Sequence, residues 1–136
     1  MSQMSDYLEG QLRAHIFRTA SFTKPTVLAV SLHTANPTDA ASGAEVTGGS
    51  YARVSLNPLD TNWSGGTSTD GITQNLSTVT FPAPTANWGT VTHFGIWDAT
   101  TAGNLLCYGA LTTSKTINNG DAAPSFATSA ITVTFA

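Results

Sequence analysis

Three histidines, eight acidic residues and many hydroxyl side chains supply the groups from which a hydrolytic site could be assembled. His33, His93 and Asp98 with a serine would form such a set on paper. No segment, however, resembles a nucleophile elbow or another signature in which the local backbone geometry activates a serine. The sequence therefore predicts that the protein is not an enzyme.

The same residues give no pattern typical of a metal or cofactor site. His33 and His93 stand singly on separate predicted strands, without ligand spacing nearby. The glycine pairs 48–49 and 65–66 do not lead from a strand into a helix, as a phosphate-binding loop would. Cys107 lies in the apolar segment NLLCYGAL, which favours a packed, unreactive thiol. No cofactor and no metal ion is expected.

Two further pairs of residues are candidates for binding. Trp63 and Trp88 lie in predicted loops, where tryptophans either mark a surface that binds protein or sugar or, as we favour here, cap the ends of a β core. Arg53 and Glu45 are among the few charged residues. An arginine within a strand either faces solvent or forms an ion pair across an interface, because a lone buried charge is costly.

The composition excludes several classes of partner. The 136 residues fit one domain, only 10% of them are charged, and the net charge is −3. Binding to nucleic acid or to an anionic membrane surface requires clustered Lys and Arg, and the chain has five such residues in all. No apolar run approaches the roughly 20 residues of a membrane span. The N-terminus MSQMSDYLEG does not resemble a secretory signal, so we expect synthesis and first residence in a cytoplasm.

One helix is predicted, from Ser5 to Arg18. Leu8, Leu12 and Ile16 recur every fourth residue and form one apolar stripe, and Ser5 is a suitable N-cap. A helix this short needs a partner surface to be stable, which would be either its own sheet or a neighbouring subunit.

From residue 26 onward the pattern is that of β-structure. Runs rich in Val, Ile, Thr and aromatic residues predict strands near 26–33, 50–57, 75–81, 90–98, 104–113 and 129–135. Repeated alternation between turns indicates a sandwich or barrel. We therefore predict a helix and linker arm over residues 1–25, followed by a single antiparallel β-sandwich domain over residues 26–136.

Alternation within two strands predicts which side chains share a face. The segment 90–97 places on one face Val91, His93, Gly95 and Trp97, and on the other Thr92, Phe94 and Ile96. The last strand points inward Ile131, Val133 and Phe135.

A long loop of small and polar residues, Thr34 to Gly49, joins the first two predicted strands. A loop of this length in a small domain is usually a functional arm or an insert. It contains Asn36 and Pro37, and we interpret it as an arm that reaches a partner.

Several segments resemble small structural proteins of tailed phages, in the same order along nearly the whole chain. They are 31–37 (SLHTANP), 43–53 (GAEVTGGSYAR), 79–84 (VTFPAP), 94–98 (FGIWD), 104–111 (NLLCYGAL), 117–121 (INNGD) and the strand 131–135. Members of this family are commonly labelled tail fibre or minor tail proteins. Proteins of this size also resemble capsid decoration, or cement, proteins with a jelly-roll fold, so the resemblance implies a jelly-roll-like sandwich. The resemblance brings no catalytic residues.

Between these two roles, the sequence favours the capsid decoration protein. A receptor-binding fibre usually has collagen-like or β-helical repeats, and this chain has none. We therefore expect a protein that binds the outer capsid surface of the virion, bridges neighbouring major capsid subunits, and is assembled in the host cytoplasm. Tail fibre or minor tail protein, or a carbohydrate-binding receptor module, are the alternatives. The expected partners are the major capsid protein and the chain itself, as a homodimer or trimer.

The interface candidates come from the helix stripe, the long loop and its flanking strand, and the loop tryptophans. They are Leu8, Leu12, Ile16, Asn36, Pro37, Glu45, Tyr51, Arg53, Trp63 and Trp88.

Overall fold

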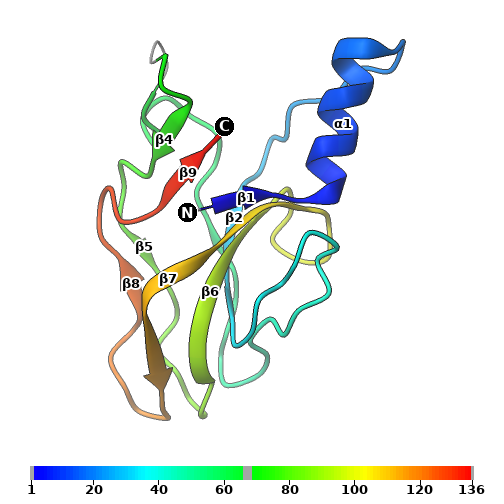
Figure 1. Cartoon of the computed structure of the whole chain (residues 1–136). Helices are drawn as coiled ribbons and strands as arrows, with labels where there is room; N and C mark the ends of the chain where they lie inside the picture. Colours follow the sequence, from blue (N-terminus) through cyan, green and yellow to red (C-terminus); the bar gives the residue numbers. More distant parts are fainter. Residues whose placement is uncertain (1, 66–68, 136) are drawn as a thin grey trace.

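The computed structural model describes residues 2–65 and 69–135 as one helix and nine short to medium strands (Figure 1). The elements are β1 (Ser2–Met4), α1 (Asp6–Phe17), β2 (Ala29–His33), β3 (Val54–Ser55), β4 (Ile72–Gln74), β5 (Val79–Thr80), β6 (Gly89–Trp97), β7 (Leu105–Ile117), β8 (Ser125–Phe126) and β9 (Thr132–Thr134). The main sheet has the order β1-β7-β6-β2-β3, and β4-β9 and β5-β8 form two further sheets. Every pairing of these strands is antiparallel.

The predicted fold class, mainly antiparallel β with one short N-terminal helix, is confirmed. The jelly-roll arrangement is not confirmed by the five-, two- and two-stranded sheets. Three strands were missed: β1, which lies inside the predicted arm 1–25 and pairs with β7, β4, which pairs with β9, and β8. All three are too short to show alternation, so their pairing depends on contacts with distant parts of the chain.

Some strand bounds were also wrong. The predicted strand 75–81 is reduced to β5, and the predicted strand 50–57 is reduced to β3. The predicted strand 104–113 extends to Ile117 as β7. Buried Asn75 explains the interruption between β4 and β5, because its side-chain Oδ1 accepts from Ile131 N and its Nδ2 donates to the carbonyls of Ser77 and Ala127. The side-chain hydrogen bonds of Asn75 thus take the place of regular backbone pairing between strands at this position.

The predicted helix is confirmed with nearly the expected bounds. Ser5 caps it, since its Oγ accepts a hydrogen bond from Leu8 N at 3.2 Å. The same hydroxyl donates to the carbonyl of Leu105 and so attaches the start of α1 to β7. Only Leu8 is buried along the helix, and the C-terminal turns stand off the β body (Figure 1).

The main core lies between the inner face of the five-stranded sheet and the two smaller sheets. The register pairs Val30 with Ile96 and Leu32 with Phe94, which places these four side chains on one face. The residues that cover them include Val79, Phe81, Ile131 and Val133. Ile131 and Val133 point inward as predicted, whereas Phe135 is exposed.

A β-bulge corrects the predicted faces of β6. The register with β7 shifts between Val91 and His93, so that Val91 joins the main core with Phe94 and Ile96. Strict alternation would have placed Val91 with His93 instead. One extra residue in a strand reverses the faces on either side of it, and a sequence pattern does not mark where it occurs.

We predict that Ser5→Ala lowers the free energy of unfolding by about 1–2 kcal/mol, because an N-cap and a bond to β7 are both lost. Urea unfolding of the variant, followed by circular dichroism, measures this change. Ser21→Ala, at an exposed position after the helix, is the control. An equal, small effect of both substitutions would contradict the role given to Ser5.

Candidate functional site

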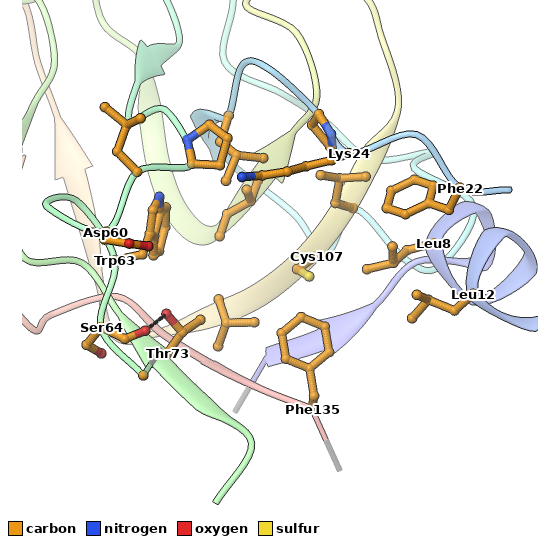
Figure 2. Close-up of a pocket in the computed structure, with 18 residues that line it drawn as sticks. Leu8, Leu12, Phe22, Lys24, Asp60, Trp63, Ser64, Thr73, Cys107 and Phe135 are labelled. Carbon is orange, nitrogen blue, oxygen red and sulfur yellow. Dashed lines mark hydrogen bonds between the residues drawn. The ribbon is translucent and has the colours of Figure 1, made fainter. Parts of the chain in front are cut away.

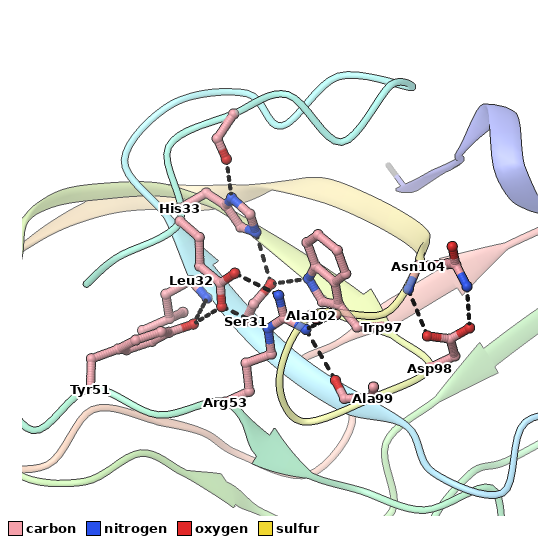
Figure 3. Close-up of polar contacts among 12 residues, drawn as sticks. Ser31, Leu32, His33, Tyr51, Arg53, Trp97, Asp98, Ala99, Ala102 and Asn104 are labelled. Atoms are coloured by element: carbon pink, nitrogen blue, oxygen red, sulfur yellow. Dashed lines mark hydrogen bonds and ion pairs between the residues drawn. The ribbon is translucent and has the colours of Figure 1, made fainter. Parts of the chain in front are cut away.

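The outer face of β2 carries a continuous network of polar contacts, shown in Figure 3. Trp97 Nε1 donates to Ser31 Oγ at 2.8 Å, and Ser31 Oγ lies 2.8 Å from His33 Nε2. His33 Nδ1 lies 2.7 Å from the carbonyl oxygen of Gly43. Since a carbonyl only accepts, Nδ1 carries the proton, and in the neutral ring the Ser31 hydroxyl donates to Nε2. The bond to Gly43 holds the end of the long loop against the sheet.

An ion pair lies beside this network. Glu45 accepts from Arg53 through both carboxylate oxygens, at 2.7 Å from Nε and 2.7 Å from Nη2. Tyr51 donates to Glu45 Oε1 at 2.9 Å, and its hydroxyl oxygen accepts from Leu32 N at 3.0 Å. The Arg53 side chain is 7% exposed and that of Glu45 is 23% exposed. Arg53 thus neither faces solvent nor reaches beyond its own chain, which were the two alternatives weighed from the sequence.

Arg53 also fixes the turn between β6 and β7. Its Nη1 donates to the carbonyls of Ala99 and Ala102, at 3.1 and 2.8 Å. Its guanidinium carbon lies 3.8 Å from the centre of the Trp97 ring, in a cation–π arrangement. Arg53, directly before β3, therefore joins the long loop and the β6–β7 turn.

The pKa values of His33 and Glu45 are both lowered, for different reasons. Desolvation lowers the pKa of His33 from 6.5, although the bond to Gly43 and the charge of Glu45 oppose this. Desolvation acts to raise the pKa of Glu45, but Arg53 and Tyr51 stabilise the carboxylate and bring the pKa below 4.5. The native structure consequently favours neutral His33 and ionised Glu45.

The long loop is folded onto the body and is not an extended arm. Thr34 N donates to Ala44 O and Val46 N to Leu32 O, and Asp6 N at the helix start donates to Asp39 O. Pro37 is fully buried, whereas Asn36 is exposed and its Oδ1 accepts from Thr38 N at 2.9 Å. The interpretation of this segment as a projecting arm is therefore corrected. The small and polar residues of this loop led to the expectation that it is exposed. The sequence does not show that Pro37 and Val46 pack against the body.

The two loop tryptophans have different places. Trp88 is 5% exposed, and its Nε1 donates to Gly49 O at 2.9 Å. It packs edge-on against Tyr51, with ring centres 5.4 Å apart. Trp63 is half-buried, and its Nε1 donates to Leu56 O at 3.0 Å. Trp88 is therefore a core residue, and only Trp63 takes part in a cavity wall.

That cavity is an open, mainly apolar groove between α1 and the segment 58–65, with a volume of about 460 Å³ (Figure 2). Leu8 and Leu12 of α1, together with Phe22, form one wall, and Asp60 and Trp63 belong to the opposite wall. Its apolar lining also includes Ile96, Leu106, Cys107 and Val133, and Phe135 lies at the end of β9. Burial raises the pKa of the Cys107 thiol to about 12, which agrees with the predicted unreactive cysteine.

The structure brings together two groups of the predicted site residues. Glu45, Tyr51 and Arg53 meet in the polar network, and Leu8, Leu12 and Trp63 line the groove. Of the remaining four, Ile16 lies exposed near the helix end, and Asn36 and Pro37 belong to the folded loop. Trp88 is in the core and contacts only Tyr51 of the predicted set through its ring.

The sequence reasoning missed the groove residues Phe22, Leu59 and Phe135. These three residues are apolar and stand beside polar segments, which could have marked them as candidates. The fold decides that they lie around the same groove. It also missed that His33 and His93 are direct partners across β2 and β6. Even so, no group of three or more His, Cys, Asp or Glu residues suited to a metal ion occurs within 2–65 and 69–135. In the same ranges, no helix has the length and apolarity to span a bilayer.

Fold and surface together define a small antiparallel β protein with an apolar groove beside its one described helix. The model of the family described as "Podophage GP4 fiber I protein gp80" matches residues 3–134. The chain therefore belongs to this family and is a structural protein of a phage virion. No curated protein matches the chain.

We predict that Glu45→Gln lowers the free energy of unfolding by about 3 kcal/mol, because it leaves a nearly buried arginine without its counter-charge. Urea unfolding at pH 7 measures the loss. Arg53→Lys keeps the charge but loses the two-pronged geometry, so it should also destabilise. Lys115→Met, at an exposed cation of β7, is the control and should change the stability by less than about 0.5 kcal/mol.

We further predict that acid destabilises the protein in two steps. Below pH 6.5 the unfolded chain takes up a proton that folded His33 resists, so stability falls; below pH 4.5 the contribution of ionised Glu45 is lost as well. Two other titratable groups near His33, Arg53 and His93, also lower its pKa. Burial lowers the pKa of His93 itself as well.

The measurement is the free energy of unfolding at a series of pH values from 8 to 4. In His33→Gln the decline between pH 6.5 and 4.5 should become shallower, whatever the stability of the variant at pH 8. An unchanged slope would show that His33 is not the group responsible.

Proposed function

We propose that this protein is a component of a podophage tail fibre and not a decoration protein of the capsid. The observation that carries the proposal is the family match over residues 3–134, nearly the whole chain, to a protein described as fiber I. The same match gives no support to the capsid role favoured by the sequence analysis.

Two structural observations also weaken the arguments for the other roles. The capsid reading relied on a long arm, and that loop is packed on the body by Pro37 and by the bond of His33 to Gly43. The carbohydrate reading relied on exposed loop tryptophans, and Trp88 is in the core while the indole N–H of Trp63 is bonded within the chain.

The proposed role is non-enzymatic and depends on binding alone. In support of this, the side chains best suited to catalysis form hydrogen bonds within the chain. They are Ser31, His33 and Glu45. In the described part of the chain every buried side-chain nitrogen and oxygen has a hydrogen-bond partner. Such groups act as supports of the fold, and contacts with other virion subunits would use the remaining surface.

The test is to locate and count the protein in purified particles. Quantitative mass spectrometry should give far fewer copies than of the major capsid protein, and a labelled antibody should mark the tail in electron micrographs. Particles incubated with pre-immune serum are the control. A copy number comparable to that of the major capsid protein, with label over the shell, would overturn the proposal in favour of capsid decoration.

A further inference from the structure

The end of α1 carries the two most exposed large apolar side chains of the described ranges. Ile16 is 66% exposed and Phe17 is 80% exposed, whereas Leu8 at the start of the helix is 6% exposed. Figure 1 shows the last turns of the helix standing away from the β body. Large apolar side chains gathered at such a place mark a surface for contact with a partner or with an apolar phase.

Most of the positive charge of the chain lies in the same segment, residues 13–24. Of the five Lys and Arg residues, this segment contains Arg13, Arg18 and Lys24, and all three are exposed. It contains no Asp or Glu, so it carries a charge of +3 in a chain whose net charge is −3. Among the described residues, the one ion pair uses Arg53 and none of these three. We call residues 13–24 the basic tip.

The fold presents the basic tip as one projecting part of the molecule. Phe22 N donates to His15 Nδ1 at 3.2 Å, so the chain that follows α1 is held against the end of the helix. Figure 1 shows this chain turning back at the end of α1 and returning to the β body. Lys24 then lies beside Leu12 and Phe22 at the groove (Figure 2). The exposed apolar and basic side chains of the tip therefore face a partner together.

This pairing of side chains matches the surface of an anionic lipid bilayer. Apolar side chains enter the boundary between headgroups and acyl chains, while Arg and Lys remain at the level of the phosphates. A purely apolar protein surface would instead bury the cations of the tip without counter-charges, which is costly.

The acidic side chains near the tip define how it meets the bilayer. Asp6 and Glu9 lie in the first turn of α1, at the end that is attached to the body. Asp60 lies on the far wall of the groove. Since anionic lipid repels these three carboxylates, the end of the helix is favoured as the point of contact over its start or the groove.

We propose that the basic tip anchors this protein to the surface of an anionic phospholipid bilayer. Ile16 and Phe17 enter the interface, and Arg13, Arg18 and Lys24 bind lipid phosphates, while the β body stays in water. The small number of cations in the whole chain argued against such a surface. That count does not show that three of the five cations surround the two most exposed apolar side chains. The anchor does not depend on where in the virion the protein lies.

The first experiment is co-sedimentation of the purified chain with lipid vesicles. The protein should sediment with vesicles of phosphatidylcholine and phosphatidylglycerol, and should stay in solution with vesicles of phosphatidylcholine alone. High salt should release it, because screening weakens the attraction of exposed charges to the lipid phosphates. No sedimentation with the anionic vesicles, or equal sedimentation with both kinds, would overturn the proposal.

Matched substitutions test whether the tip makes the contact. Arg18→Gln should lower the partition coefficient for anionic vesicles about fivefold, because one cation near the lipid surface is lost. Lys115→Gln is the control with the same change in net charge. Lys115 is exposed near the end of β7, which points away from α1 (Figure 1), so binding should persist.

The double variant Ile16→Ser with Phe17→Ser tests the apolar part of the contact. It should lower the partition coefficient by more than about tenfold, because two inserted side chains are lost. Leu76→Ser is its control, since Leu76 is 44% exposed and does not line the groove. Circular dichroism should be unchanged in all these variants, as each position is exposed. Equal loss of binding in variants and controls would contradict the assigned surface.

A fluorescent probe distinguishes insertion of the tip from attraction of the whole molecule. Phe17→Cys is labelled with a fluorophore whose emission depends on polarity, and Leu76→Cys is the labelled control. Burial raises the pKa of Cys107 to about 12, so the native thiol does not compete for the label. Anionic vesicles should shift the emission at position 17 to shorter wavelength and leave that at position 76 unchanged.

Two outcomes of the labelling would overturn the proposal. In one, the protein sediments with the vesicles but the probe at position 17 stays in water, so another surface binds the lipid. In the other, the probe is in an apolar environment before lipid is added, and a protein surface then covers the tip.

Discussion

Burial of β2 on both faces is the constraint on which the rest of the structure depends. All five of its residues are buried, including Ser31 and His33. The inner face packs in the main core, and the outer face must be covered by something that also satisfies its polar groups. The segment from Thr34 to Val46 does this, by a carbonyl for His33 and a carboxylate for Arg53. A loop of polar composition thereby becomes part of the packed structure.

This arrangement explains how a chain with so few charges uses them. Glu45 lies in the covering loop, and Arg53 directly precedes β3, the edge strand of the main sheet beside β2. Their ion pair, with Tyr51 and the carbonyls of the β6–β7 turn, links three segments that are distant in sequence. The arginine binds the carboxylate through two hydrogen bonds, and the pair is largely shielded from water. Such a pair has a larger effect on stability than an exposed one. Its function is structural, and the surface left for partners lies elsewhere.

The side of the molecule that carries α1 has the most exposed large apolar side chains of the described ranges. The helix is attached at its start, through Ser5 and Leu8, and free at its end, where Ile16 and Phe17 are exposed. The groove beside it is apolar and open. A phage structural protein functions through contacts with other subunits, and an amphipathic helix with an adjacent groove provides a binding surface whose strength comes from burial of apolar area.

The sequence alone determined the features that depend on near neighbours. A serine cap with leucines every fourth residue is enough to specify α1, and alternating β-branched residues are enough to specify an antiparallel β protein. Tertiary structure decided the rest: the bulge that turns Val91 inward, the opposition of His33 and His93, the partner of Arg53, and the burial of Pro37 and Trp88. Each of these depends on strand order and register, which are set by contacts between residues far apart in the chain and leave no local period in the sequence.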